Sequence, residues 1–239
     1  MHVLRRINET KFVSFSGIDG AGKSTQIEAL CMLLREDGRR VCVIRFWDDI
    51  ARLTRIREAA GHSLFRGDKG IGTPTSPINR RDKNVKSFLM TWVRLLLYFM
   101  DAISLRVVLQ EALQTDVDLV IFDRYIYDEL ANLTLRNPAI RTYIRLIMKL
   151  VSKPDISYLL DADPIKARAR KPEYPLEFLD TNRQSYLDLN DLIGGMTVIA
   201  PMPVEEVKRA VLRHAQEKLS FETNDRNRDG GLFFERSQL

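Results

Sequence analysis

The stretch G-I-D-G-A-G-K-S, residues 17–24, decides the fold. It fits the pattern G-x-x-x-x-G-K-[ST], in which closely spaced glycines allow backbone N–H groups to converge on phosphate oxygens. A short apolar run precedes it and a helical pattern follows it, which is the strand–loop–helix context that the pattern requires. We therefore predict a phosphate-binding loop, with ATP as its ligand and Mg²⁺ as the accompanying ion.

Residues in and near this loop have expected roles. Lys23 should reach the β- and γ-phosphates, and the hydroxyl of Ser24 should ligate Mg²⁺. Asp123 directly follows another apolar run, so it should lie at a neighbouring strand tip and bind the ion through water. The alternative for Asp123 is a helix N-cap, where aspartate is common. The loop residues expected to hold ATP are Gly17, Asp19, Gly20, Ala21, Gly22, Lys23, Ser24 and Thr25.

Five short apolar runs have the pattern of buried strands in a parallel sheet, because each is continuous rather than alternating. They are residues 12–16, 41–46, 119–122, 156–160 and 197–200. Helical patterns lie at residues 24–35, 85–114, 128–135, 139–151, 164–169, 176–192 and 204–219. Strands that alternate with helices predict an α/β fold of three layers, with a five-stranded parallel sheet and helices on both faces.

Bulk composition limits the class of protein. The chain has 239 residues, of which 45% are apolar and 29% charged, so one domain over residues 1–220 with a sizeable core is expected. The net charge of +5 suits an anionic partner, and the phosphates of a nucleotide explain it as well as a nucleic acid does. We therefore do not expect nucleic-acid binding. Cys31 and Cys42 form no C-x-x-C pair, which argues against a zinc site or a disulfide framework.

No segment has the length of a membrane span. The most apolar window, residues 88–100, is interrupted by Arg94 and closed by Asp101, and it falls short of the ~20 residues needed to cross a bilayer. It is expected to be a buried helix. The first eleven residues lack the apolar run of a signal peptide, so we expect a cytoplasmic protein.

Two segments stand apart from the strand–helix pattern. Residues 51–83 carry eight basic residues, and we favour a solvated insertion there over a basic flap that covers an acceptor substrate. Residues 221–239 are polar and interrupted by two adjacent glycines, so we expect a flexible tail.

A basic segment after the fourth strand suggests a lid. Residues 162–183 include Arg168, Arg170 and Lys171, which suit a lid that closes over transferring phosphates and excludes water. Water must be excluded because it would compete with the acceptor of a kinase. A solvated basic helix is the alternative.

The span from residue 11 to residue 219 resembles the thymidylate kinase family. The loop F-S-G-I-D-G-A-G-K-S-T at residues 15–25 is close to the family's F-E-G-x-D-G-A-G-K-S-T, and residues 123–125 match its D-R-Y motif. Residues 183–189 look like its R-x-x-Y-L-x-L helix, and residues 198–207 like its closing strand and helix. The resemblance implies a P-loop kinase fold with a lid, which transfers the γ-phosphoryl group of ATP to a nucleoside monophosphate.

The resemblance also implies roles for single residues. Asp19 would serve the acceptor side of the loop and Arg124 the acceptor phosphate. Some family members carry an arginine where this chain has Gly20, so here the lid should supply it, and we favour Arg168 over Arg170. The residues implied for catalysis are therefore Lys23, Asp19, Arg124, Arg168 and Arg170, with Ala200 beside the nucleotide. Those implied for the acceptor are Asp48, Arg57, Asp101, Arg106, Arg124 and Tyr125.

The acceptor side departs from the family pattern. The usual R-E-P-G-G-T after the second strand is replaced by R-F-W-D-D at residues 45–49. The family's A-A-D-R step reads F-M-D-A at residues 99–102, so Ala102 replaces an arginine, and Arg106 lies one turn further along the helix. Asp128, Glu129 and Leu133 occupy positions that line the family's thymine pocket. We therefore expect thymidine monophosphate to be a poor acceptor.

Two other functions stay open. Asp48 beside Trp47 resembles deoxynucleoside kinases, in which a carboxylate is the base for a 5′-hydroxyl, so the acceptor is alternatively a hydroxyl group. The chain is alternatively a non-catalytic module that binds ATP. A GTPase is disfavoured because the sequence has no N-K-x-D motif. The sequence does not give the oligomeric state, and a homodimer is kept open.

Overall fold

The computed structural model describes residues 10–50, 88–219 and 234–235. The predicted insertion at residues 51–83 lies outside the described residues. No helix in the described ranges is both long and apolar enough to cross a membrane.

The sheet is parallel throughout and has the order β5-β4-β1-β3-β2-β6. Its five main strands confirm the prediction of a five-stranded parallel sheet. They are β1 (Lys11–Ser16), β2 (Val41–Arg45), β3 (Leu119–Asp123), β4 (Ile156–Leu160) and β5 (Met196–Ile199). The two-residue strand β6 (Phe234–Glu235) pairs with β2, so this part of the expected flexible tail lies at the edge of the sheet.

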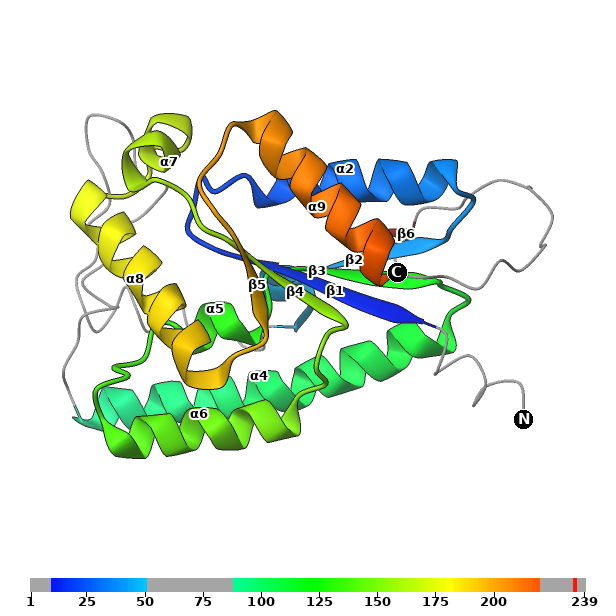
Figure 1. Cartoon of the computed structure of the whole chain (residues 1–239). Helices are drawn as coiled ribbons and strands as arrows, with labels where there is room; N and C mark the ends of the chain where they lie inside the picture. Colours follow the sequence, from blue (N-terminus) through cyan, green and yellow to red (C-terminus); the bar gives the residue numbers. More distant parts are fainter. Residues whose placement is uncertain (1–9, 51–87, 220–233, 236–239) are drawn as a thin grey trace.

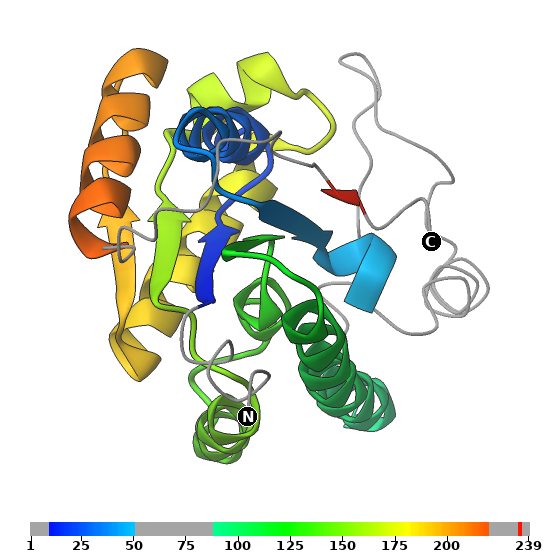
Figure 2. The ribbon, with the colours of Figure 1, turned by 90° about the vertical axis from the view of Figure 1, so that its right-hand side faces the viewer.

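Helices cover both faces of the sheet, which confirms the three-layer α/β architecture (Figures 1 and 2). α2 (Lys23–Glu36) and α9 (Val204–Lys218) lie on one face. The other face carries α4 (Phe88–Gln114), α5 (Ile126–Leu130) and α6 (Pro138–Leu150). α7 (Pro164–Arg170) and α8 (Leu176–Ile193) connect β4 to β5, and the short π-helical turn η1 (Phe46–Ile50) follows β2.

Local sequence explains where several helices begin and end. The side chain of Asn137 accepts a hydrogen bond from the amide of Ala139, 2.9 Å away, and Pro138 occupies the first turn of α6. α2 stops before Gly38, whose φ of 71° is the left-handed conformation that glycine adopts readily. The helix predicted at residues 128–135 is shorter than expected and starts earlier. The observed helix is α5, which begins at Ile126 and ends at Leu130.

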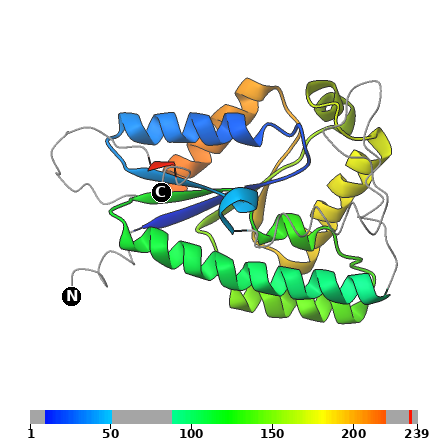
Figure 3. The ribbon, with the colours of Figure 1, turned by 180° about the vertical axis from the view of Figure 1, so that it is seen from behind.

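The core has two parts, one on each side of the sheet. Val13 and Phe15 of β1 pack with residues of α2 and α9, whereas alternate strand residues face α4, α5, α6 and α8. α4 is only half buried, contrary to the prediction of a buried helix at residues 88–100. Trp92 is 58% exposed and Leu96 is 61% exposed, on the outer face of a helix that runs along one side of the molecule beside α6 (Figure 3).

Candidate functional site

The phosphate loop connects β1 to α2, as predicted. Gly17, Gly20 and Gly22 have φ angles of 140°, 79° and 92°, which L side chains rarely adopt. A β-carbon on Gly17 would lie 2.6 Å from the carbonyl oxygen of Leu160, so only glycine fits there. Gly22 is the N-cap of α2 and gives it no side-chain cap, which leaves the first-turn N–H groups for an anion. These features fit the phosphates of ATP.

Lys23 is buried within the loop. Its Nζ donates hydrogen bonds to the carbonyl oxygens of Gly17 at 2.8 Å and Ile18 at 3.0 Å. Burial and the nearby charge of Arg124 lower the pKa of Lys23 to about 8. The amine therefore already lies in the loop, and phosphate oxygens would replace carbonyl oxygens as its partners.

The two residues expected to hold Mg²⁺ come from adjacent elements. Ser24 is exposed in the first turn of α2, and Asp123 ends β3 in register with Phe15 of β1. Tyr125 is the N-cap of α5, so Asp123 does not have the alternative role of helix cap. Within the described ranges no group of three or more His, Cys, Asp or Glu residues is suited to a metal. A magnesium ion here would therefore depend on phosphate oxygens as well as on Ser24 and Asp123.

Arg124 links the loop to the residues after β3. Its φ of 71° is unusual for a residue with a side chain, and its backbone N–H donates to the carbonyl of Phe15 at 3.0 Å. Nη2 lies 2.5 Å from Oδ1 of Asp19, and Nη1 lies 3.2 Å from Oδ1 of Asp128. The guanidinium is thus held between two carboxylates. Arg124 is the residue that the resemblance assigns to binding the acceptor phosphate.

The electrostatics of Asp19 reflect the cations around it. Burial by itself would raise the pKa of its carboxyl group, but the charges of Arg124, Lys23 and Lys171 lower it to about 2. Asp19 is therefore a carboxylate at neutral pH. Asp19 is close to Lys23 of the loop and to Arg124 after β3. The residue expected to bind ATP and the residue expected to bind the acceptor phosphate therefore lie near each other.

α7, the helix of the predicted lid, packs directly on the phosphate loop. Gly20 touches the backbone of Ala167 so closely that a β-carbon would overlap its carbonyl group. Nη1 of Arg170 lies 3.9 Å from the place of a β-carbon on Gly22, and Nζ of Lys171 lies 3.8 Å from Oδ1 of Asp19. Successive residues of a helix are rotated by about 100°. Arg170 therefore lies about 60° around α7 from Ala167, the residue that contacts the loop, whereas Arg168 lies about 100° from it.

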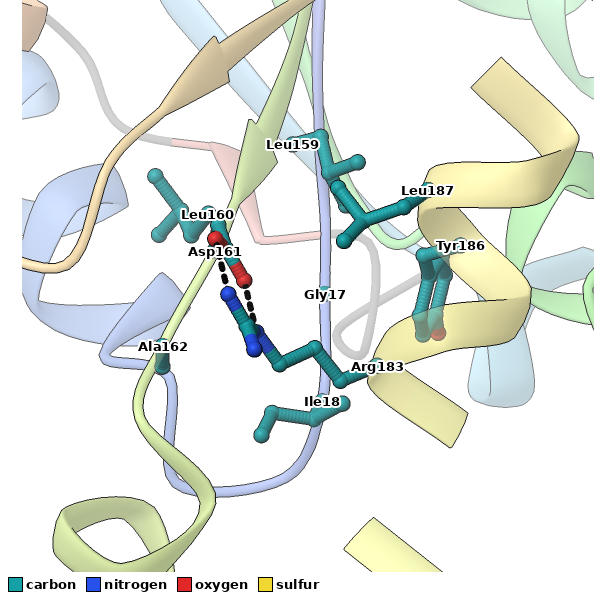
Figure 4. A pocket seen from close by; sticks show the side chains of 9 residues that line it. All are labelled: Gly17, Ile18, Leu159, Leu160, Asp161, Ala162, Arg183, Tyr186 and Leu187. Carbon is teal, nitrogen blue, oxygen red and sulfur yellow. Dashed lines mark hydrogen bonds and ion pairs between the residues drawn. The ribbon is translucent and has the colours of Figure 1, made fainter. Parts of the chain in front are cut away.

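A small pocket lies behind the loop, between the end of β4 and α8 (Figure 4). Nε and Nη2 of Arg183 donate to the two carboxylate oxygens of Asp161, at 2.5 and 2.8 Å. This paired hydrogen bond fixes α8 to the strand that precedes the lid. The pocket is lined by Gly17, Ile18, Leu159, Leu160, Asp161, Ala162, Arg183, Tyr186 and Leu187.

Two residues predicted for the acceptor side are buried, and a third lies away from the loop edge. Asp101 is fully buried in α4, so its carboxylate is not presented to a ligand. Tyr125 is 1% exposed, and its hydroxyl donates to the carbonyl of Ser152 in the core. Arg106 is exposed, one turn closer than Ala102 to the end of α4 that leads into β3, and thus further from the edge with the loop.

The other acceptor-side predictions have mixed outcomes. Asp48 is exposed in η1, directly after β2 and therefore at the loop edge of the sheet. Ala200 is exposed just beyond β5, at the same edge. Arg57 lies outside the described residues. The expectation that Asp128, Glu129 and Leu133 present charge and bulk to a base is wrong for this structure, because they are only 4%, 3% and 7% exposed.

Three contacts near the loop were not predicted from the sequence: Ala167 against Gly20, Lys171 beside Asp19, and Tyr186 bonded to Asp128. A signal for Ala167 was present, since a small residue opposite Gly20 permits close backbone approach. Tyr186 donates from its hydroxyl to Oδ1 of Asp128 at 2.7 Å, a pairing over 58 residues of sequence that no local pattern indicates.

Comparisons with known proteins agree with this geometry. A "Probable thymidylate kinase" of Archaeoglobus fulgidus is 28% identical over 220 residues, which cover 89% of this chain and 98% of the relative. A "Thymidylate kinase" of Bifidobacterium longum is 30% identical over 188 residues, with 74% and 82% covered. A "Probable thymidylate kinase" of Pyrococcus abyssi is 27% identical over 219 residues, with 87% and 97% covered.

One family model points to a different class of P-loop protein. The model described as "Methylmalonyl Co-A mutase-associated GTPase MeaB" matches residues 1–48. That stretch includes β1, the phosphate loop, α2 and β2, elements that bind a nucleotide without deciding the reaction. The match therefore supports nucleotide binding and leaves the rest of the chain to decide the family.

Proposed function

We propose that this chain, which belongs to the thymidylate kinase family, transfers the γ-phosphoryl group of ATP to a nucleoside monophosphate. It is a phosphotransferase of the nucleotide-kinase type. The observation that carries the proposal is the contact of Arg124 with Asp19, at 2.5 Å. Arg124 is a cation suited to an acceptor phosphate, and this contact holds it against the loop suited to ATP. In-line transfer needs both substrates side by side.

Each residue of the site then has a defined task. Lys23 exchanges its loop carbonyls for the β- and γ-phosphates, and Arg124 orients the acceptor phosphate. Arg170 reaches over the loop at Gly22 and balances the charge that spreads over the transferring group. Mg²⁺, when bound near Ser24 and Asp123, neutralises charge on the phosphates.

The lid has a second task, which is to keep water out. Ala167 and Gly20 are in contact, so the helix leaves no gap over that part of the loop. Exclusion of water prevents hydrolysis from competing with transfer. A docked lid with a cation over the loop is therefore more consistent with a kinase than with a hydrolase.

An acceptor panel tests the proposal. ADP formation from ATP-Mg²⁺ should be measured with nucleoside monophosphates, deoxynucleosides and 5′-hydroxyl oligonucleotides. We expect the highest kcat/KM with a nucleoside monophosphate, and the same panel tests the sequence-based prediction that thymidine monophosphate is a poor acceptor. Highest turnover with thymidine monophosphate would refute the specificity; no acceptor-dependent ADP from any compound would refute the function and favour a non-catalytic module.

The second candidate is a kinase for a hydroxyl acceptor. It is favoured by the exposed Asp48, since a carboxylate at this edge of the sheet would take the proton of a hydroxyl group. The same panel separates the two, because this candidate predicts the best turnover with a deoxynucleoside. Asp48→Asn would then abolish activity, whereas a monophosphate kinase would keep most of it.

We also propose that the protein forms a homodimer through α4. Six large apolar side chains on its outer face, spread over about 22 Å of helix, are 37–61% exposed. A monomer rarely exposes such a continuous apolar stripe. The exposed Arg106 lies at the edge of this stripe and its members are all apolar, so a second copy, related by a two-fold axis, would cover it with matching chemistry. Its members are Trp92, Leu96, Phe99, Met100, Ile103 and Val107.

A further inference from the structure

Asp128 is a buried carboxylate in α5 with four hydrogen-bond donors around it. Oδ2 accepts from the hydroxyl of Ser16 at 2.6 Å and from the backbone N–H of Tyr125 at 3.1 Å. Oδ1 accepts from the hydroxyl of Tyr186 at 2.7 Å and from Nη1 of Arg124 at 3.2 Å. Each oxygen therefore has two donors, which matches the full accepting capacity of a carboxylate.

The donors come from elements that the site must hold in place. Ser16 is the last residue of β1 and directly precedes the phosphate loop. Arg124 follows β3, and Tyr186 belongs to α8, the helix after the lid. A single side chain thus joins the loop, the acceptor-side cation and the lid segment. Buried networks with every member satisfied are rigid, and they lose that rigidity when one member is removed.

We propose that Asp128 is a positioning residue that holds Arg124 in the orientation needed to bind the acceptor. The inference rests on the proposed function, in which Arg124 contacts the acceptor phosphate. It assigns Asp128 a role different from contact with a base, which its burial excludes. It also assigns Tyr186 the role of fixing Asp128 from the lid side.

The geometry of Arg124 explains why it needs such support. Its backbone has a φ of 71°, and its guanidinium reaches Asp19 with one terminal nitrogen and Asp128 with the other. Two of its five N–H donors are held by these carboxylates, which fixes the plane in which the remaining donors point. Without Asp128 the guanidinium would turn about its single contact with Asp19. The donors would then meet an incoming phosphate in many orientations.

The test compares three single variants in the full-length protein. Asp128→Asn keeps the size of the side chain but replaces an accepting oxygen with an NH₂ group. Tyr186→Phe removes one donor and leaves Asp128 in place, so it serves if the first variant folds poorly. Tyr127→Phe is the matched control, because this buried hydroxyl of the same helix pairs with Ser157 at 3.3 Å and does not contact Asp128.

We expect kcat/KM for the best monophosphate to fall roughly ten- to hundredfold in Asp128→Asn, as for loss of one hydrogen bond to a charged group. The fall should be smaller in Tyr186→Phe and less than about twofold in Tyr127→Phe. The Kd of ATP, measured by calorimetry, should stay within about twofold in all three, since the proposal assigns Arg124 to the acceptor phosphate and Lys23 to ATP.

Two results would overturn the inference. One is an unchanged kcat/KM for the acceptor in both Asp128→Asn and Tyr186→Phe. The other is an equal loss of ATP affinity, which indicates general distortion of the site. Failure of the proposed function looks different, because the wild type itself would then form no ADP with any acceptor. In that case the melting temperatures of Arg124→Lys, Asp128→Asn and the double variant test whether Asp128 holds Arg124. If the decrease in the double variant equals the sum of the two single decreases, the residues are not coupled and the inference is wrong.

Discussion

Lys23 must exchange its hydrogen-bond partners when ATP binds. In the free protein its Nζ is buried against two carbonyl oxygens, and burial lowers its pKa to about 8, below the usual value of 10.5. The triphosphate would surround the amine with negative charge and raise that pKa again. ATP binding is therefore expected to be coupled to protonation of Lys23.

This coupling gives a pH-dependent prediction. At pH 9 about 90% of the free protein should carry a neutral Lys23, so ATP binding should take up ~0.9 proton; at pH 7 it should take up ~0.1. Titration calorimetry in buffers of different ionisation enthalpy measures the uptake. Lys23→Arg is the control, since arginine stays protonated at both pH values. Equal uptake by the two proteins at pH 9 would contradict the assignment.

The sequence located the phosphate loop, whereas it did not show which residues near the acceptor side are buried. Lys23 and Ser24 belong to one contiguous motif whose conformation is set by its own glycines, so spacing alone located them. Tyr125 and Asp101 were misplaced because the sequence does not show which way a side chain points. The partners of Asp128 lie as far as 112 residues away in the chain and meet only through the tertiary fold.

At the scale of elements, α7 and the phosphate loop act as one unit. The helix is capped by Asp163, whose Oδ1 accepts from the amides of Ile165 and Lys166 at 2.9 and 3.0 Å. The cap fixes where the helix starts and therefore which residues face the loop. The sequence indicated the helix and its basic residues, but it did not set this rotation, and it favoured Arg168 over Arg170.

The rotation of α7 predicts which arginine acts in transfer. Arg170→Ala should lower kcat by ~10²–10³-fold with little change in ATP affinity, because the cation acts on charge that develops in the transition state. Arg168→Ala should lower it much less, because Arg168 lies about 100° around the helix from Ala167, further than Arg170. Single-turnover kinetics with the best acceptor measures both. A larger loss in Arg168→Ala would show that the lid rotates before transfer.

The contact between Gly20 and Ala167 predicts a steric effect on the lid. Gly20→Ala would push α7 off the loop, so kcat should fall at least about tenfold. Gly38→Ala is the matched control, since Gly38 also has a positive φ but open space around it. Both variants should lose roughly 1 kcal/mol of unfolding free energy to backbone strain. Equal kcat values in the two would contradict the docked lid.

At the scale of the whole molecule, the exposed face of α4 predicts assembly. The protein should sediment as a dimer, and Leu96→Glu should convert it to a monomer by burying a charge in the interface. Leu146→Glu is the control, because Leu146 on α6 is 55% exposed but lies outside the α4 stripe. Analytical ultracentrifugation measures both. A wild type that stays monomeric at micromolar concentration would contradict the dimer.

The whole fold was the most predictable part of the molecule. Continuous apolar strands separated by helices leave few arrangements other than a parallel sheet covered on both faces. The pairing of Phe234–Glu235 with β2 was not predictable, because two residues carry no periodic signal. The exposure of one side of α4 was also missed, since its composition is apolar on every face.

The central claim is that the γ-phosphoryl group passes to an organic acceptor rather than to water. The most direct test uses γ-labelled ATP with Mg²⁺ and the best monophosphate from the panel, and it identifies the labelled product by chromatography. We expect label in a nucleoside diphosphate, and no transfer by Lys23→Ala. Label only in inorganic phosphate would contradict it and indicate a hydrolase.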